Sequence, residues 1–373
     1  MADDNIEADR WSDQDSAFGG TASIADSTTS ITSSIRDSVF NYQFEHGRRY
    51  HAFQAGKYIF PNDEQEMERM DIEHHNQKLQ MNGELFLCPL VDEPTEILDL
   101  GTGTGIWCID MADKYPDCQL IGTDLSPVQP SWTPPNCRFE IDDFDKEWTF
   151  GSDRFDMIRH AFIVGHVKDY PEFYKRAFNA LKPGGSMQIV EIEFQLYCDD
   201  GTLAPDSALL KWCSLMYEAF AKIGAVVPTA ENYKEWLEDA GYENVHLEII
   251  KRPSNDWPKD PKWKEIGRYC CLNFLEGMEG FTVGPLTRLL GWKPEEVQVL
   301  LAQMRTEWLK RKIHAYHKGY ELPMNVSNRL LWYQAYACYY GYPWTALMTF
   351  VRVWSIRKSE HGDRQVDYAA PAP

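Results

Sequence analysis

The sequence predicts an α/β fold in which helices cover both faces of a mostly parallel sheet. Across residues 96–194, short apolar runs typical of strands alternate with helical patterns, which is the arrangement of such a sheet. Within this part the apolar run Glu96–Leu100 passes through three closely spaced glycines, and a helical pattern begins directly afterwards at Ile106. A strand that turns sharply into a helix brings backbone N–H groups close to a bound ligand.

The remaining elements follow from hydrophobic periodicity and from breakers. Strands are expected at Glu96–Leu100, Gln119–Thr123, 139–143, Phe155–Ala161, Met187–Glu191 and Val245–Ile250, with an edge strand at Phe350–Arg357. Helices are expected at Glu64–Leu79, Ile106–Tyr115, Tyr170–Leu181, twice within 205–241, and at Trp263–Gly280 and Pro294–Arg311. Four prolines make Ser126–Asn136 a loop.

Composition narrows the class of protein. The 373 residues carry a formal charge of −20, which repels phosphate backbones, so direct nucleic-acid binding is not expected. The nine cysteines form no C-x-x-C pair and no secretory signal begins the chain, which fits reduced thiols in the cytoplasm or nucleus. No metal is expected, because His314 and His317 lack the spacing of a common zinc motif. The 22 uncharged residues between Arg329 and Arg352 include glycine, proline and five tyrosines, so we expect a buried segment there and no membrane span.

Two acidic residues frame the glycine turn. Asp99 stands two residues before the first glycine, and Asp124 ends the second strand, where a carboxylate can bind ribose hydroxyls. A nicotinamide dinucleotide site is the obvious alternative, but its fingerprint places a third glycine three positions after the second. Position 106 is isoleucine, so the pattern is Asp-x-Gly-x-Gly-x-Gly instead.

That pattern resembles the first motif of the class I S-adenosylmethionine-dependent methyltransferases. Further stretches resemble the same family in the right order: 139–143 its third strand, 155–161 its fourth, and Leu181–Gly185 the turn into its fifth. The resemblance implies a Rossmann-like, seven-stranded, mostly parallel sheet and S-adenosyl-L-methionine as the cofactor.

More specifically, the chain resembles the fungal LaeA-like methyltransferases over about residues 40–315 and again near 350–358. The matching segments are Glu45–His51, Pro61–Glu64, Asp71–His74, Arg252–Pro258 and Leu290–Trp292. The resemblance implies a role in fungal secondary metabolism. Some members regulate it in the nucleus with velvet-type proteins, and others are tailoring enzymes. No Lys/Arg cluster resembling a nuclear signal is present near the N-terminus, which favours a tailoring enzyme in the cytoplasm over a nuclear regulator.

These expectations divide the chain into segments. They are a disordered acidic, Ser/Thr-rich tail (1–38), a helical pre-domain or cap (39–95), the methyltransferase core (96–258), a helical substrate-side addition (259–317), an irregular aromatic insertion (318–349), the final strand (350–358) and a second tail (359–373). The composition of 318–349 also allows it to be sequence that a correct gene model lacks.

The cofactor residues follow from the motifs. Asp99 is expected to bind the methionyl amino group, Asp124 the ribose, and Asp142 or Asp143 the adenine, with Asp143 preferred because the alternation of Phe139 and Ile141 leaves it at the strand end. The full expected set is Asp99, Gly101, Thr102, Gly103, Gly105, Asp124, Leu125, Asp142, Asp143 and Phe144.

Methyl transfer needs alignment of the reacting atoms, and a base only where the acceptor loses a proton. His160 and His166 lie at and just after the fourth strand and are the candidate bases, although a lone histidine there is often structural. Tyr50, His51 and Tyr58 are expected to close over the cofactor or to pack the N-terminal segment. The predicted function is O- or N-methylation of a small molecule in a fungal secondary-metabolite pathway; the alternative is a LaeA-like regulator that acts through nuclear protein complexes.

Overall fold

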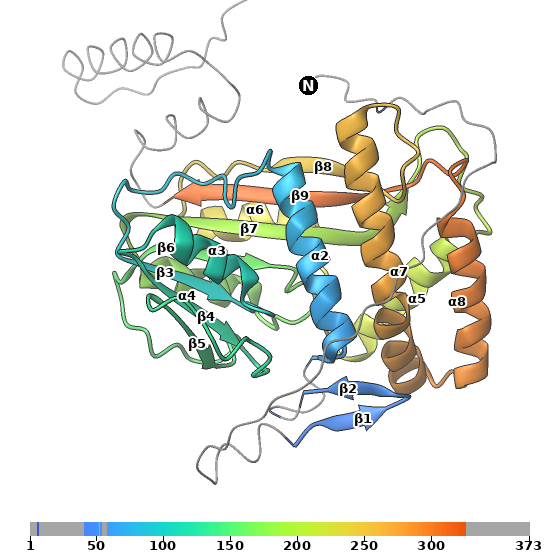
Figure 1. Ribbon diagram of the computed structural model, residues 1–373, viewed down its shortest axis with the longest axis horizontal. Coiled ribbons are helices and arrows are strands. Elements are labelled where there is room, and N and C mark those ends of the chain that lie inside the picture. Colours follow the sequence, from blue (N-terminus) through green and yellow to red (C-terminus); the bar gives the residue numbers. More distant parts are fainter. Residues whose placement is uncertain (1–5, 7–40, 52, 54–57, 326–373) are drawn as a thin grey trace, which may run out of the picture.

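The computed structural model describes residues 6, 41–51, 53 and 58–325 of the chain (Figure 1). Several expected segments lie outside these residues, apart from residue 6. They are the tails at 1–38 and 359–373, the strand at 350–358 and the uncharged stretch between Arg329 and Arg352. No helix within the described ranges has the length and apolar character that a membrane crossing requires.

A seven-stranded sheet forms the frame of the molecule, in the order β5-β4-β3-β6-β7-β9-β8. The strands are β3 (Glu96–Leu100), β4 (Gln119–Asp124), β5 (Cys137–Ile141), β6 (Phe155–Ala161), β7 (Leu181–Tyr197), β8 (Glu248–Pro253) and β9 (Tyr316–Asn325). Strands β5, β4, β3, β6 and β7 are parallel to their neighbours, and β9 is antiparallel to both β7 and β8. The expected seven-stranded, mostly parallel sheet is confirmed.

The position of the seventh strand differs from the expectation. Strand β9 already occupies the place between β7 and β8, so residues 318–325 belong to the sheet and not to an irregular insertion. Leu322 and Met324 are fully buried opposite Ile189 and Met187 of β7. Pro323 hides this alternation in the sequence, because a proline within a run argues against an interior strand.

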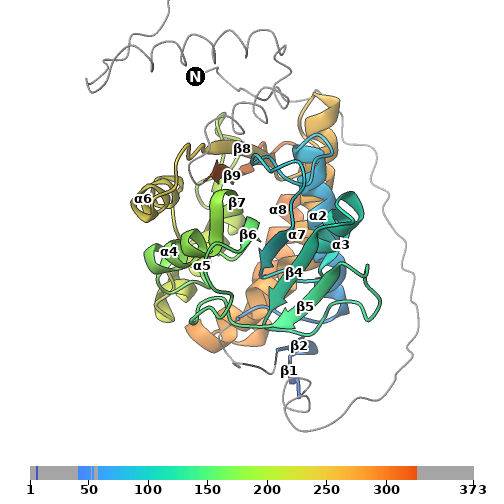
Figure 2. The same ribbon diagram turned by 90° about the vertical axis from the view of Figure 1, so that its left-hand side faces the viewer.

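Helices cover both faces of the sheet (Figure 2). On one face α4 (Tyr170–Ala180) and α6 (Ala230–Ala240) pack over a core that includes Leu98, Leu100 and Phe173. On the other, α3 (Ile106–Lys114) buries Trp107 and Met111 against Ile97 and Leu120. Adjacent residues of β3 therefore enter opposite cores, as strand geometry requires.

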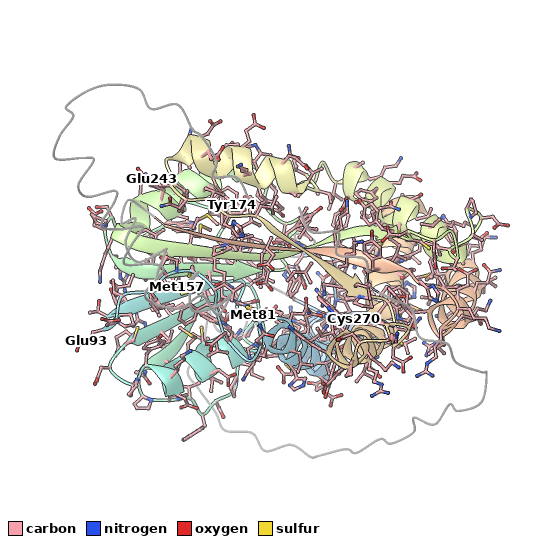
Figure 3. The ribbon with its side chains drawn as sticks, turned by 90° about the horizontal axis from the view of Figure 1, so that it is seen from above. Met81, Glu93, Met157, Tyr174, Glu243 and Cys270 are labelled. Atoms are coloured by element: carbon pink, nitrogen blue, oxygen red, sulfur yellow. The ribbon has the colours of Figure 1, made fainter. Side chains whose placement is uncertain are left out.

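A second, helical half lies beyond the carboxyl ends of the strands. It contains α2 (Glu64–Gln80), α5 (Ala208–Lys222), α7 (Pro261–Leu290) and α8 (Pro294–Trp308). Helices α5, α7 and α8 share a third apolar core with the last part of β7, whereas the buried residues of α2 are polar. Figure 3 shows Met157 and Tyr174 in the sheet half and Cys270 of α7 in the helical half. Helix α7 runs ten residues further than expected, with Gly277, Gly280 and Gly284 inside it although glycine disfavours a helix interior. Neighbouring side chains approach these glycines closely.

The segment before the sheet is not wholly helical as expected. It opens with a hairpin of β1 (Gln43–Glu45) and β2 (Arg48–Tyr50), and α2 follows. The two turn residues, His46 and Gly47, both have positive φ, at 51° and 79°, which fits the type I′ turn of a two-residue hairpin. Arg48 then makes two hydrogen bonds of 2.6 and 2.7 Å to Asp63, the N-cap residue of α2, so the hairpin is fastened to that helix.

Candidate functional site

The glycine turn after β3 lies at the floor of a cavity of about 160 Å³. Gly103 and Gly105 have φ of 58° and 79°, a region that favours glycine. A Cβ on Gly105 would lie 2.3 Å from the ring of Phe139, and one on Gly103 would lie 2.9 Å from Met70 Sδ. The turn therefore needs glycines both for its conformation and for close packing. Gly101, Thr102 and Gly103 line the cavity, whereas Gly105 caps α3 behind it.

Asp124 lines the same cavity from the end of β4. Its Oδ2 accepts the N–H of Gly103 at 2.9 Å, and its Oδ1 accepts that of Ser126 at 2.9 Å. Burial raises the pKa of this carboxyl to about 6, although the two amide hydrogen bonds lower it. Each oxygen keeps a second lone pair, so the side chain can still accept hydrogen bonds from two neighbouring hydroxyls, as a ribose presents them.

The two candidates for the adenine side separate in space. Asp143 lines the cavity with Phe144 and is 4% exposed, while Asp142 is half-buried and is not among the lining residues. The Oδ1 of Asp142 instead accepts the N–H of Asp143 at 2.8 Å, which shapes the turn. Leu125 lines the cavity beside Asp124, so carboxylates, apolar wall and turn amides form one continuous surface.

Asp99 lies behind this surface. It is 1% exposed, and its Oδ1 accepts a hydrogen bond of 2.8 Å from Nη1 of Arg159 on the neighbouring strand β6. Arg159 is the residue that lines the cavity; its Nη2 donates to Gln77 of α2 at 3.0 Å, and its guanidinium lies 4.5 Å above the ring of Trp107. The cationic group that Asp99 contacts is therefore one of the chain's own side chains.

The two histidines proposed as bases lie in different surroundings, because His160 belongs to β6 and His166 follows it in the chain. His160 is fully buried in the core, where its Nε2 lies 3.2 Å from the hydroxyl of Tyr174 and its Nδ1 lies 3.4 Å from Glu191. It is not among the residues that line the cavity, so this placement does not bring it to a ligand. His166 does line the cavity, with its ring 4.6 Å from that of Tyr58.

Of the three N-terminal candidates Tyr50, His51 and Tyr58, it is Tyr58 that lines the cavity. Both ring nitrogens of His51 lie within 3.0 Å of backbone carbonyls, those of Phe53 and Tyr58, so it positions the segment that carries Tyr58. Tyr50 is buried beneath the guanidinium of Arg288, 4.5 Å from its ring. His51 and Tyr50 therefore support the cap, and Tyr58 forms the cavity wall.

A second cavity, of about 130 Å³, adjoins the first and was not expected from the sequence. The two share Tyr58, Arg69, Glu73 and Phe162 in their linings. Its other walls are largely aromatic and come from β7, α5, α7 and α8 as well as from residue 60; they include Phe60, Phe194, Trp212, Phe274, Phe281 and Trp308.

A buried chain of charged and polar groups runs along the shared wall. Arg69 of α2 pairs with Glu66 at 2.7 Å and donates to Asn273 of α7 at 2.8 Å. Asn273 in turn donates to Glu73 at 2.9 Å, and Glu73 pairs with Arg252 of β8 at 2.6 Å. Glu73 and Arg252 fall within the segments Asp71–His74 and Arg252–Pro258 that carried the family resemblance, and that was the one sequence signal for them.

The first cavity fits a cofactor that has a ribose, an adenine and a charged amino-acid end. Paired acceptor sites on Asp124 suit the ribose, Asp143 and Phe144 suit the adenine side, and the guanidinium of Arg159 suits a carboxylate.

Comparison with known proteins gives a consistent result. Residues 44–247 match the family model of a methyltransferase domain. The methyltransferase pytC of Aspergillus terreus is 42% identical over 77% of this chain and 89% of its own length. The secondary metabolism regulator LAE1 of Cochliobolus heterostrophus is 40% identical over 74% of this chain and 92% of its own length. The protein-methionine methyltransferase laeA of Emericella nidulans is 36% identical over 73% of each.

Proposed function

This chain belongs to the S-adenosylmethionine-dependent methyltransferase family that includes pytC and the LaeA-type regulators, and from that premise we propose that it methylates a small molecule held in the second cavity. The proposed acceptor takes the methyl group on oxygen or nitrogen. The cofactor supplies a methyl group on a positively charged sulfur, which makes that carbon open to attack.

The observation that carries this proposal is the shared wall between the two cavities. Methyl transfer is an in-line displacement, so the acceptor atom must approach the methyl carbon from the side opposite the sulfur. A separate, mainly aromatic cavity next to the cofactor cavity provides that approach. It also keeps water from the reacting atoms, which strengthens the electrostatic contacts there.

The chain's own residues have distinct parts in this proposal. Asp124 binds the ribose hydroxyls, Asp143 lies on the adenine side, and Arg159 faces the carboxylate end of the cofactor. Tyr58 and Phe162, which belong to both linings, orient the acceptor against the cofactor. Of the two histidines considered as bases, His166 remains the candidate, because it lines the cofactor cavity.

Calorimetric titration with S-adenosylhomocysteine tests the cofactor site. For the unaltered protein we expect a dissociation constant in the micromolar range, which corresponds to a binding free energy of roughly −8 kcal/mol. Asp124→Ala should abolish binding, because it removes both the ribose contacts and the amide contacts that hold the turn. Glu140→Ala is the matched control: it removes the same charge from an exposed side chain outside the cavity and should bind normally. A folded wild-type protein that does not bind, or equal losses in the two variants, would contradict the proposal.

A second function, regulation of secondary metabolism through protein complexes, is favoured by the names of LAE1 and laeA among the relatives. In that case the partners would be velvet-type proteins and the compartment the nucleus. Tagged protein from the native host distinguishes the two functions. Co-purification with such partners, together with broad loss of metabolites on deletion, supports the regulator. Accumulation of a single unmethylated intermediate supports the small-molecule enzyme and its placement in the cytoplasm.

A further inference from the structure

Two polar side chains face the second cavity from adjacent strands. Arg252 of β8 and His317 of β9 are register partners in the sheet, and both belong to the cavity lining. Both are buried, at 4% and 9% exposure. Together with Glu193 of β7 they are the polar groups that the sheet presents to a cavity whose walls are otherwise mainly aromatic. Neither Arg252 nor His317 has a part in binding the cofactor as proposed above.

The hydrogen bonds of His317 define its tautomer. Its Nδ1 lies 3.0 Å from the carbonyl oxygen of Glu193 and 3.2 Å from that of Gln195. A carbonyl oxygen only accepts, so Nδ1 carries the proton and Nε2 carries a lone pair. Burial and the nearby Arg252 lower the pKa of this histidine to about 4, which keeps the ring neutral at pH 7. Among the described residues, Nε2 has no hydrogen-bond partner, so a proton acceptor is available in the cavity.

Arg252 supplies the complementary group. Its Nη2 is bound to Glu73 at 2.6 Å, and its guanidinium lies 5.7 Å from the ring of Phe162 in the shared wall. Its Nε is fully buried and makes no hydrogen bond within the described part of the chain, although the thiol of Cys270 interacts with the same guanidinium. Buried donors are almost always paired in folded proteins, so an unpaired one beside a cavity indicates a ligand atom that accepts a hydrogen bond.

We propose that the acceptor is a flat aromatic or enolic compound whose hydroxyl gives its proton to Nε2 of His317 while Arg252 holds the oxygen anion that results. This rests on the proposed function. The acceptor oxygen forms a bond to the methyl carbon as the carbon–sulfur bond breaks, and that electron pair stays on sulfur. The hydroxyl proton ends on Nε2 and leaves later to water. Atoms and charge therefore balance without a further reactant.

The electrostatics of the pair suit this transfer. The guanidinium of Arg252 makes His317 a weaker base, but it lowers the pKa of a hydroxyl at its Nε in the same way. Glu73, bound to Nη2 of the guanidinium, keeps the wall near neutrality. Glu193, the other carboxylate of the cavity lining, accepts hydrogen bonds of 2.8 and 2.7 Å from Tyr197 and Tyr320. Each hydroxyl takes one lone pair of a Glu193 oxygen. On β8 and β9, the open proton acceptor that lines the cavity is Nε2 of His317.

The test uses 4-nitrophenol, a phenol that is still substantially protonated at neutral pH and whose ionisation is visible in its absorption spectrum, with the full chain saturated with S-adenosylhomocysteine. We expect the wild-type protein to bind the probe and to increase its phenolate band at neutral pH. His317→Asn keeps an amide near the Nδ1 position for the two carbonyls but lacks Nε2, so the probe should bind without the increased band. Arg252→Lys keeps the charge opposite Glu73 but lacks Nε, and should weaken probe binding.

His314→Asn is the matched control, since that histidine bonds to Asp200 and lines neither cavity. It should behave as wild type. An unchanged phenolate band in His317→Asn, or no probe binding by the wild type, would overturn the proposal. Preferential binding of 4-nitrobenzoate, unaffected by His317→Asn, would also overturn it in favour of a carboxylate acceptor. Titration with S-adenosylhomocysteine tests the proposed function separately. If the wild type does not bind it, the assigned cofactor site is wrong. If it binds normally but the probe test fails, only the roles given to His317 and Arg252 are wrong.

Discussion

The two cavities are adjacent but are constructed in different ways. The cofactor cavity is formed chiefly by short turns at the ends of β3, β4, β5 and β6, so its ligands come from backbone amides and from side chains one or two residues past a strand. The second cavity is formed by side chains from α2, α5, α7, α8 and three strands, which meet only in the folded chain.

This difference has a physical consequence. Positions in the first cavity are fixed by local backbone geometry, so a change there should act on cofactor binding through the turn itself. Positions in the second cavity are fixed by packing between distant elements, so a change there should act on the acceptor and on stability while cofactor binding is kept. If the two cavities are separate in this sense, a substitution in one should leave ligand binding in the other unchanged. The expected effects run from the largest to the smallest.

The largest effect is expected at the ion pair that lies under the cofactor cavity. Arg159→Gln leaves Asp99 as an unpaired buried charge, so unfolding free energy should fall by about 3–5 kcal/mol. Asp99→Asn combined with Arg159→Gln should recover most of this loss, because neither charge then remains buried alone. Denaturant unfolding measures both variants. If Asp99→Asn alone abolished binding of S-adenosylhomocysteine without loss of stability, Asp99 would be a direct cofactor ligand, as its place in the motif suggests.

The second effect separates turn conformation from turn packing. Gly105→Ala places a methyl group within 2.3 Å of the Phe139 ring at a φ of 79°, so we expect about 2 kcal/mol of lost stability and weakened binding of S-adenosylhomocysteine. Gly151→Ala has a similar φ of 82° but open space around it, so it should lose about 1 kcal/mol and bind normally. Thermal unfolding with calorimetry checks both. Equal behaviour of the two variants would show that packing at Gly105 is unimportant.

The same contrast explains what the sequence could and could not predict. Strands β3 and β6 lie at the residues expected, and Asp124 and Asp143 line the cavity, because a strand end and a turn are local features of the chain. Asp99 is the exception. Its motif indicates a charged partner, but strand pairing brings Arg159 beside it, and no local pattern specifies which residues of two strands will pair.

The second cavity could not be assembled from local patterns. Arg252 and His317 are 65 positions apart and meet through the pairing of β8 with β9, while Glu73 reaches Arg252 from α2. Strand β9 itself was missed because Pro323 interrupts its alternation. The hairpin at His46 and Gly47, by contrast, has a local turn signal. A residue that tolerates positive φ is followed there by glycine, and this pair is typical of a two-residue hairpin turn.

The third effect is a pH dependence confined to the cofactor cavity. Below a pKa of about 6, Asp124 becomes protonated and accepts hydroxyl hydrogen bonds less well, so affinity for S-adenosylhomocysteine should be level above pH 7 and fall by up to about tenfold per pH unit below 6. Since folding raises this pKa, the stability that Asp124 contributes is present in acid and is lost as pH rises through 6. Calorimetry from pH 5 to 8 measures the affinity, and Asp124→Asn should flatten the profile. A profile that stays steep in this variant would assign the titration to another group.

The smallest effect tests the aromatic wall of the second cavity. Phe274 stacks on Trp308 with ring centroids 3.9 Å apart and meets the Trp212 ring edge to face. Phe274→Leu should reduce stability by only about 1 kcal/mol, because most of the buried volume is kept. Binding of S-adenosylhomocysteine should be unchanged and binding of 4-nitrophenol weaker. Phe178→Leu, which loses a similar ring contact with Tyr242 on the other face of the sheet, should lose comparable stability and leave both ligands unaffected. If Phe274→Leu weakened both ligands equally, the cavities would act as one site, and the separation between turn-built and packing-built regions would fail at their shared wall.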